Sequence, residues 1–119
     1  LVKALTKRRP GKPVALISPF TTAADLLREP DAVTRRTLGY AESLRTIAAE
    51  NAARQVHFID GRQILPDITG LTCDLVHPST EGHTTMSERL APKLDELLNA
   101  AQSSRERGRA KPSRRPRSS

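Results

Sequence analysis

A chain of 119 residues with 36% hydrophobic residues and only three aromatic side chains can form one small domain. The net charge of +7 suggests nucleic-acid binding, but residues 1–13 carry +5 and residues 101–119 carry +6, whereas the segment between them carries −4. The high isoelectric point therefore says little about what the folded part binds, and no apolar run is long enough to predict a transmembrane helix.

The N-terminal half predicts a helix, a strand and a second helix. Residues 1–9 have the pattern of the end of a helix, with basic residues in its last turn. Residues 14–18 form a short continuous apolar run, which is typical of a strand buried on both faces of a parallel sheet. Residues 19–32 predict a loop, and apolar residues at helical spacing predict a helix over 33–53.

The C-terminal half predicts a second strand over 55–60 and a last helix that begins at Ser79 or Thr80. A helical turn is expected at 62–65, within a segment that is mostly loop. Pro92 should kink or restart the last helix. The residues expected to form the buried stripe of this helix are Met86, Leu90, Leu94, Leu97 and Leu98.

The domain prediction follows from where these patterns stop. After Ala101 the chain is rich in Ser, Arg, Pro and Gly, so we expect a folded region over 1–101 and a disordered basic tail over 102–119. Helices alternating with two strands predict an α/β fold with a parallel sheet. Two strands do not make a sheet covered on both faces, so further strands come from a missing N-terminal part, from a partner chain, or not at all.

The segment with the strongest chemical signal places Asp74 three residues before His77, in a loop that Pro78 and Gly82 mark as the entry to a helix. A carboxylate that accepts a hydrogen bond from one imidazole nitrogen fixes the tautomer of the ring. The other nitrogen is then free to act as a general base. The spacing alone favours an ordinary loop histidine that caps the helix or bonds an acidic neighbour.

The pattern Asp-x-x-His-Pro-Ser-x-x-Gly-His, followed by an amphipathic helix, resembles the last block of the SGNH/GDSL hydrolase superfamily. The resemblance implies a three-layer α/β/α, flavodoxin-like fold whose N-terminal strands are missing from this chain. It also implies that His77 is the general base for a serine nucleophile and that Asp74 orients it. The chain departs from the family because it has no Gly-Asp-Ser and no Gly-x-Asn-Asp, so the nucleophile and the oxyanion groups must lie elsewhere.

A metal site is the alternative interpretation of the same segment. Asp74, His77 and His83 are residue types that can bind zinc. No further ligand cluster accompanies them, so we expect no metal and no other cofactor. His83 is then a structural residue in the first turn of the last helix.

Three other residues were candidates for chemistry. Ser18 ends the first strand but lacks the tight turn that exposes a nucleophile, and Cys73 is expected to be a small buried residue without a paired base. Cys73 is the only cysteine, which excludes an intrachain disulfide and is compatible with a reducing compartment. His57 is expected to be partly buried and hydrogen-bonded.

These observations predict the C-terminal part of an SGNH-type serine esterase that acts on acyl esters, with acetyl esters of carbohydrates as one candidate class. Its expected partners are the ester substrate and the missing N-terminal half, with no specific nucleic acid. The chain alone is expected to be inactive. The alternative is a non-catalytic α/β remnant whose basic tail binds nucleic acid or acidic polymers electrostatically; such a module should unfold cooperatively by itself, whereas a fragment should not.

Overall fold

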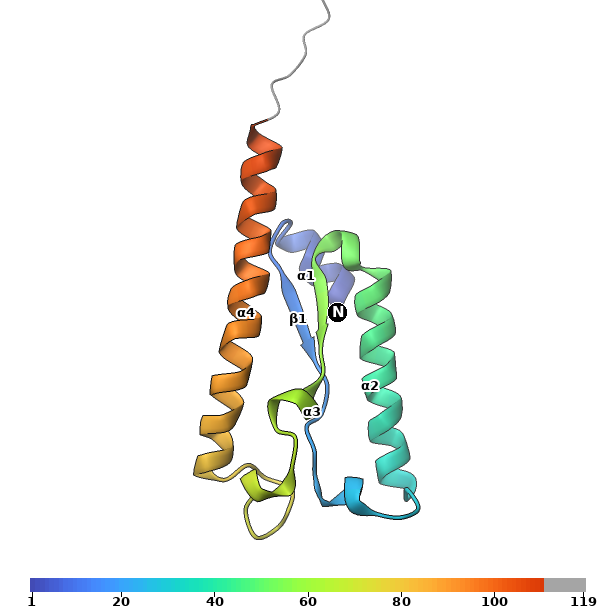
Figure 1. Cartoon of the computed structure of the whole chain (residues 1–119). Helices are drawn as coiled ribbons and strands as arrows, with labels where there is room; N and C mark the ends of the chain where they lie inside the picture. The colour runs from blue at the N-terminus through green and yellow to red at the C-terminus, as the bar shows by residue number, and fades with distance from the viewer. Residues whose placement is uncertain (111–119) are drawn as a thin grey trace, which may run out of the picture.

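The computed structural model describes residues 1–110, which form a mixed α/β structure, mostly helical, with a two-stranded parallel sheet (Figure 1). Its α-helices and strands are α1 (Val2–Arg8), β1 (Val14–Ile17), α2 (Ala32–Glu50), β2 (Val56–Ile59), α3 (Gly61–Ile64) and α4 (Thr80–Arg109). Three short 3₁₀ helices lie between them: η1 (Ala23–Leu26), η2 (Ala52–Arg54) and η3 (Ile68–Gly70). The predicted α/β class and the order of elements are confirmed.

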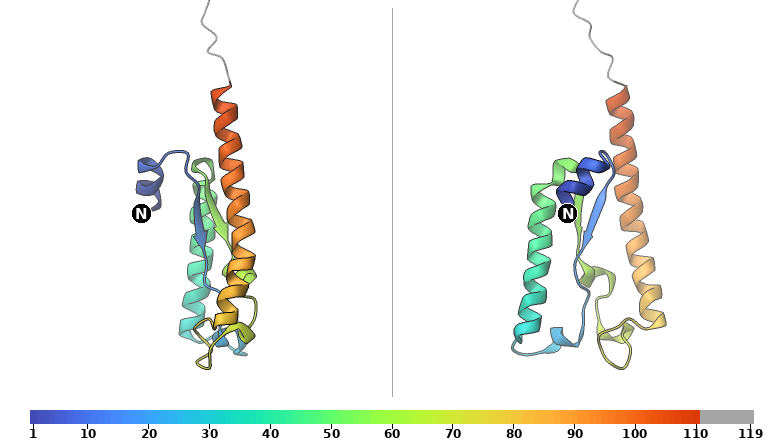
Figure 2. Two further views of the ribbon diagram at one scale, coloured as in Figure 1. Left: turned by 90° about the vertical axis from the view of Figure 1, so that its left-hand side faces the viewer. Right: turned by 180° about the vertical axis from the view of Figure 1, so that it is seen from behind.

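The sheet places the two strands side by side, with Val14 opposite Val56 and Ile17 opposite Ile59. Helix α2 connects them as the predicted crossover and packs against both strands, while α4 runs along the opposite side of the sheet (Figure 1). Helix α1 projects away from the sheet, as the left view of Figure 2 shows. Within residues 1–110 neither edge of the sheet is paired with a further strand.

The two long helices, α2 and α4, begin where a side chain can accept a hydrogen bond from one of their first backbone N–H groups. The Asp31 carboxylate accepts a hydrogen bond of 2.7 Å from the backbone N–H of Thr34, at the start of α2. The Ser79 hydroxyl accepts one of 3.0 Å from the backbone N–H of Gly82, at the start of α4. These are N-caps, and the second confirms one of the two predicted capping residues.

The core is smaller than the sequence pattern indicated. Within residues 1–110 the largest side chains that are fully buried are those of Ile64 and Leu65. Burial of β1 on both faces was a wrong prediction, because Ile17 remains 43% exposed. The apolar stripe of α4 is only half-buried, and Leu98 is 56% exposed. A sheet of two strands offers too little surface to cover two helices.

Helix α4 corrects two predictions. It runs without a restart across Pro92, which is exposed, so that the backbone carbonyl left unbonded by the proline can be hydrated. The prediction of disorder from residue 102 is wrong for 102–109, which are helical. Gln, Arg and Glu in this segment are good helix formers, and the buried Ala101 anchors it. The rest of the predicted tail, 111–119, lies outside the described residues.

No helix within residues 1–110 combines the length and the apolar character needed to cross a membrane.

Candidate functional site

The Asp74–His77 segment is a loop between η3 and α4 that is closed at its base by backbone hydrogen bonds. Leu71 and Pro78 form an isolated antiparallel bridge. The backbone N–H of Thr72 donates to the carbonyl of His77 at 2.8 Å. Such closure fixes the ends of the loop, so the side chains between them are held in a defined arrangement.

The predicted pair is formed. The Nδ1 atom of the His77 ring lies 2.6 Å from Oδ2 of Asp74. The other carboxylate oxygen, Oδ1, accepts hydrogen bonds from the Thr72 hydroxyl at 2.7 Å and from the backbone N–H groups of Val76 and His77 at 2.9 and 3.0 Å. The carboxylate is therefore bonded through both oxygens, and it can hold the imidazole in one orientation.

These donors keep the carboxylate charged. The backbone N–H of His77 has the largest effect on the pKa of Asp74, followed by the His77 ring, the Thr72 hydroxyl and the backbone N–H of Val76, and together they hold this pKa well below its usual range. An ionised Asp74 favours a proton on Nδ1 of His77, which leaves Nε2 free as a base. No hydrogen bond to Nε2 is found within residues 1–110, and the His77 side chain is 76% exposed.

The lowered pKa of Asp74 gives a pH-dependent prediction. Because folding lowers this pKa, the network stabilises the loop above the value of an unfolded Asp, about 3.9, and this contribution is lost as the pH falls below that value. We expect the ¹³C shift of the Asp74 carboxyl to stay constant from neutral pH to about pH 3. Thr72→Val removes one donor and should move the titration upward. A midpoint near 3.9 in the unmodified chain would contradict the hydrogen-bond network.

The loop turns at Leu75. Its φ of 55° lies in the left-handed region, which a bulky residue rarely adopts. The conformation is held by a hydrogen bond from the Leu75 N–H to the Thr72 carbonyl at 2.9 Å and by one from the Ala23 N–H to the Leu75 carbonyl at 3.1 Å. The turn directs the next two N–H groups at Asp74. No pattern in the sequence indicated this conformation.

Gly82, which the motif contains, has a packing role. A Cβ atom at Gly82 would lie 1.9 Å from the carbonyl oxygen of Gly70, and one at Gly70 would lie 2.6 Å from Cδ1 of Leu65. The first turn of α4 therefore sits directly on the backbone before the loop. The same contact brings the Ser79 N–H within 2.8 Å of the Gly70 carbonyl.

The remaining candidate residues do not join the pair. Ser18 is buried; its hydroxyl accepts a hydrogen bond from the Gly61 N–H at 3.0 Å and donates to Asp60 at 3.4 Å, so it ties the ends of β1 and β2 together. Cys73 is exposed, which corrects the prediction that it is buried, because the loop turns it toward solvent.

The other two histidines are not part of the hydrogen-bond network of the Asp74–His77 pair either. His83 is exposed on the first turn of α4. His57 is half-buried as predicted, but within residues 1–110 its ring has no hydrogen-bond partner. No group of three or more His, Cys, Asp or Glu side chains in the described part of the chain is arranged to hold a metal ion.

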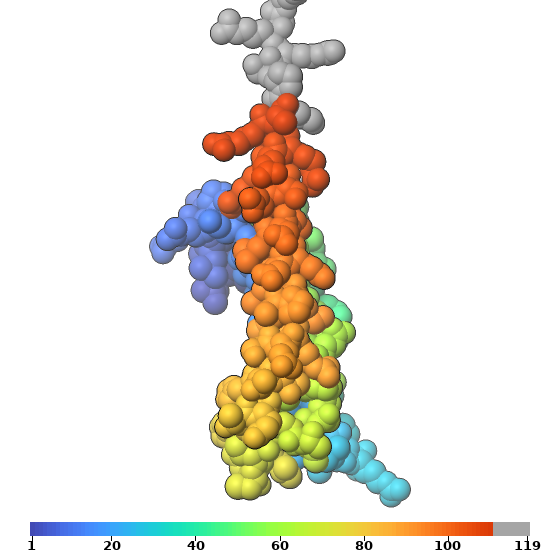
Figure 3. Space-filling view, turned by 60° about the vertical axis from the view of Figure 1, so that its left-hand side comes forward, coloured from blue at the N-terminus to red at the C-terminus, as the bar shows by residue number. Residues whose placement is uncertain are grey.

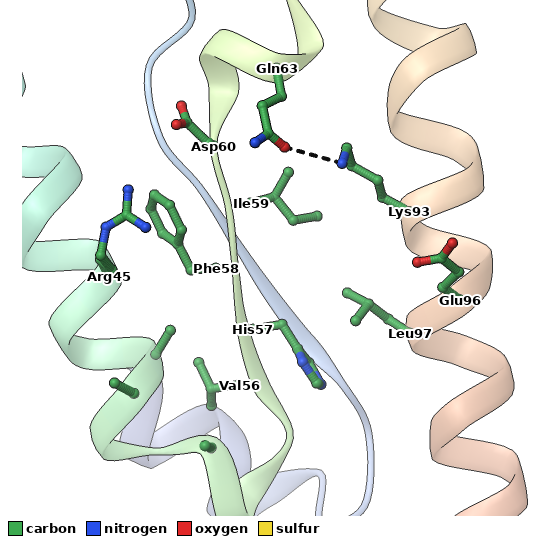
Figure 4. Close-up of a pocket in the computed structure, with 13 residues that line it drawn as sticks. Arg45, Val56, His57, Phe58, Ile59, Asp60, Gln63, Lys93, Glu96 and Leu97 are labelled. Atoms are coloured by element: carbon green, nitrogen blue, oxygen red, sulfur yellow. Dashed lines mark hydrogen bonds between the residues drawn. The ribbon is translucent and has the colours of Figure 1, made fainter.

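A groove of about 600 Å³, which no sequence pattern indicated, lies along β2 between α2 and α4 (Figure 4). Arg45 stacks 4.4 Å above the ring of Phe58 on one side, and Lys93 donates to the Gln63 side chain at 3.2 Å on the other. No residue of the loop 71–78 lines this groove. The Asp74–His77 pair is thus on an exposed loop and outside the groove.

No protein-family model, curated protein or solved structure matches this chain, so its function is inferred from its own residues.

Proposed function

We propose that this chain supplies the acid–base pair of an SGNH-type serine esterase. The observation that carries the proposal is the 2.6 Å contact between His77 Nδ1 and Asp74 Oδ2, with the opposite ring nitrogen free. This is the arrangement that a serine hydrolase requires of its histidine and aspartate. The resemblance of the surrounding motif to the superfamily supports the same function.

The proposed reaction is hydrolysis of a small acyl ester. Nε2 of His77 takes the proton of a serine hydroxyl as that oxygen attacks the ester carbonyl, and it then returns the proton to the leaving alcohol. A water molecule then attacks the acyl-enzyme: Nε2 takes a proton from the water and passes it to the serine oxygen, so that the carboxylic acid leaves and the serine is regenerated. Asp74 stabilises the imidazolium that forms in each step. The serine and the oxyanion donors would come from a polypeptide segment outside these 119 residues.

The fold is compatible with this role. In the proposed complete enzyme, β1, β2 and α4 are the last two strands and the last helix of a three-layer, flavodoxin-like domain. The parallel pair of strands has helices on both sides. Within residues 1–110 the outer edge of each strand is not paired with another strand. Further parallel strands at an open edge would supply the apolar surface that the small core lacks.

The first test is an assay of the 119-residue chain with p-nitrophenyl acetate. We expect no hydrolysis above that of the His77→Ala variant, because a histidine–aspartate pair without its nucleophile retains almost none of the catalytic power. Hydrolysis that disappears in His77→Ala would show that this chain contains a nucleophile of its own.

The second test is to read the coding sequence upstream of the Leu1 codon. An in-frame Gly-Asp-Ser, with a Gly-x-Asn-Asp further on, supports the esterase proposal. A start codon at that position with no upstream segment contradicts it.

A further inference from the structure

Basic residues near both ends of the sequence lie close together within residues 1–110. The guanidinium group of Arg105, in the C-terminal part of α4, donates a hydrogen bond to the carbonyl of Gly11, in the loop after α1. Figure 3 shows the N-terminal segment, in blue, beside the orange and red part of α4. Two charged segments that are far apart in the sequence therefore form one surface.

We call this surface the basic pole. Its members are the exposed cations beside the contact of Arg105 with Gly11 and around the hollow that Gly11 also lines: Lys3, Lys7, Lys12, Arg54 and Arg105. Within residues 1–110 none of them forms an ion pair. Residues 1–13 contain no acidic side chain, and Glu106 is the only one in 102–110. The positive charge is therefore not neutralised within the described fold.

The basic pole has a concave part. A hollow of about 600 Å³ lies between α1 and the turn that contains η2. Lys3 and Lys7 line it from α1, and Arg54 lines it from the other side. No acidic and no aromatic residue is among its lining. Such a hollow can accept an anionic group between three cations, but it offers no ring on which a base could stack.

We propose that the basic pole binds the phosphate backbone of a nucleic acid without reading its bases. Unpaired cations spread over a surface and a hollow suit a chain of phosphates, because each contact releases a condensed counterion. A bilayer surface is less well matched, because α1 has seven residues and is too short to present an amphipathic face of useful area.

The proposed surface is independent of the esterase site. The Asp74–His77 loop precedes the first turn of α4, whereas Arg105 lies near the helix end. At 1.5 Å per residue the two are separated by roughly 40 Å along α4. Bound nucleic acid would not cover His77, and the esterase function can fail without affecting this proposal.

The experiment measures binding of the full 119-residue chain to a fluorescent 20-base-pair DNA duplex by anisotropy, at 50 and 200 mM NaCl. The test variant is Lys3→Gln/Lys7→Gln/Arg54→Gln. The matched control is Arg28→Gln/Arg36→Gln/Arg89→Gln, which removes the same charge from exposed positions elsewhere. Circular dichroism establishes that both variants keep the helix content of the parent.

The test variant should raise Kd about tenfold or more at 50 mM NaCl and flatten the slope of log Kd against log salt by about 2 to 3, because up to three phosphate contacts are lost. The control should change Kd by less than about twofold, since surface charges away from the contact act only through screened long-range attraction. Equal weakening in the two variants would overturn the proposal, because net charge alone would then explain binding.

A second measurement needs no variant. DNA should protect Lys3, Lys7 and Lys12 of the unmodified chain from acetylation, while Lys93, on the middle of α4, keeps its reactivity. Protection confined to Lys111 would assign binding to the segment after the basic pole and overturn the proposal. Binding to vesicles containing phosphatidylserine but not to DNA would also overturn it, in favour of a membrane surface.

Discussion

In the proposed esterase, His77→Ala should lower turnover by about a millionfold, measured with p-nitrophenyl acetate on the chain expressed together with the coding sequence upstream of Leu1. The Asp74 contact holds Nδ1, so Nε2 is the ring atom available to move protons in both half-reactions. Without it the serine hydroxyl stays protonated and attacks poorly. KM should change little, because the exposed ring contributes little to ground-state binding.

Two variants give this prediction its controls. Asp74→Asn should lower turnover by about ten thousandfold, because an amide at this position favours the wrong tautomer of His77. His83→Ala should leave turnover unchanged, since His83 is exposed on α4 and within residues 1–110 its side chain forms no hydrogen bond with the pair. A loss in His83→Ala as large as that in His77→Ala would assign the base to the wrong histidine.

Gly82→Ala should destabilise the chain by about 3 kcal/mol, in urea unfolding followed by circular dichroism. The added methyl group would lie 1.9 Å from a backbone carbonyl oxygen of Gly70, and backbone cannot move aside as a flexible side chain can. The first turn of α4 must therefore lift away from Gly70. The loop amide of Thr72 should lose its protection against hydrogen exchange in the same variant.

Gly39→Ala is the matched control for Gly82→Ala. Gly39 lies inside α2, and a Cβ atom there would have nothing within 4 Å. Alanine at an open helical position should stabilise the chain by about 1 kcal/mol. If the loss in Gly82→Ala exceeds the total stability, that variant should lose its helical signal while Gly39→Ala keeps it. Similar effects of the two substitutions would contradict the close contact.

The sequence predicted the elements well where local patterns determine them. The apolar runs before Ser18 and Asp60 became the two paired strands, helical spacing located α2, and the predicted capping residue Ser79 located the start of α4. The Asp74–His77 pair was also predictable, because the three-residue spacing and the motif place both side chains in one loop. Its function stays a prediction.

Other features depended on contacts that local patterns do not encode. The left-handed conformation of Leu75 is held in part by Ala23, about fifty residues earlier in the chain. The helical state of residues 102–109 coincides with the contact between Arg105 and Gly11. The exposure of Ile17 follows from the absence of a third strand within residues 1–110, whereas its apolar neighbours indicated burial.

The short base of the Asp74–His77 loop has a consequence for the order of folding. The bonds that close it join residues less than ten positions apart, such as Thr72 and His77 or Gly70 and Ser79, whereas the sheet must bring Val14 to Val56. Closing a short loop costs less chain entropy than closing a long one, and local contacts form first. The histidine and its carboxylate can therefore come together before the strands have paired. The geometry of the loop is then set mainly by its own hydrogen bonds and depends little on the sheet.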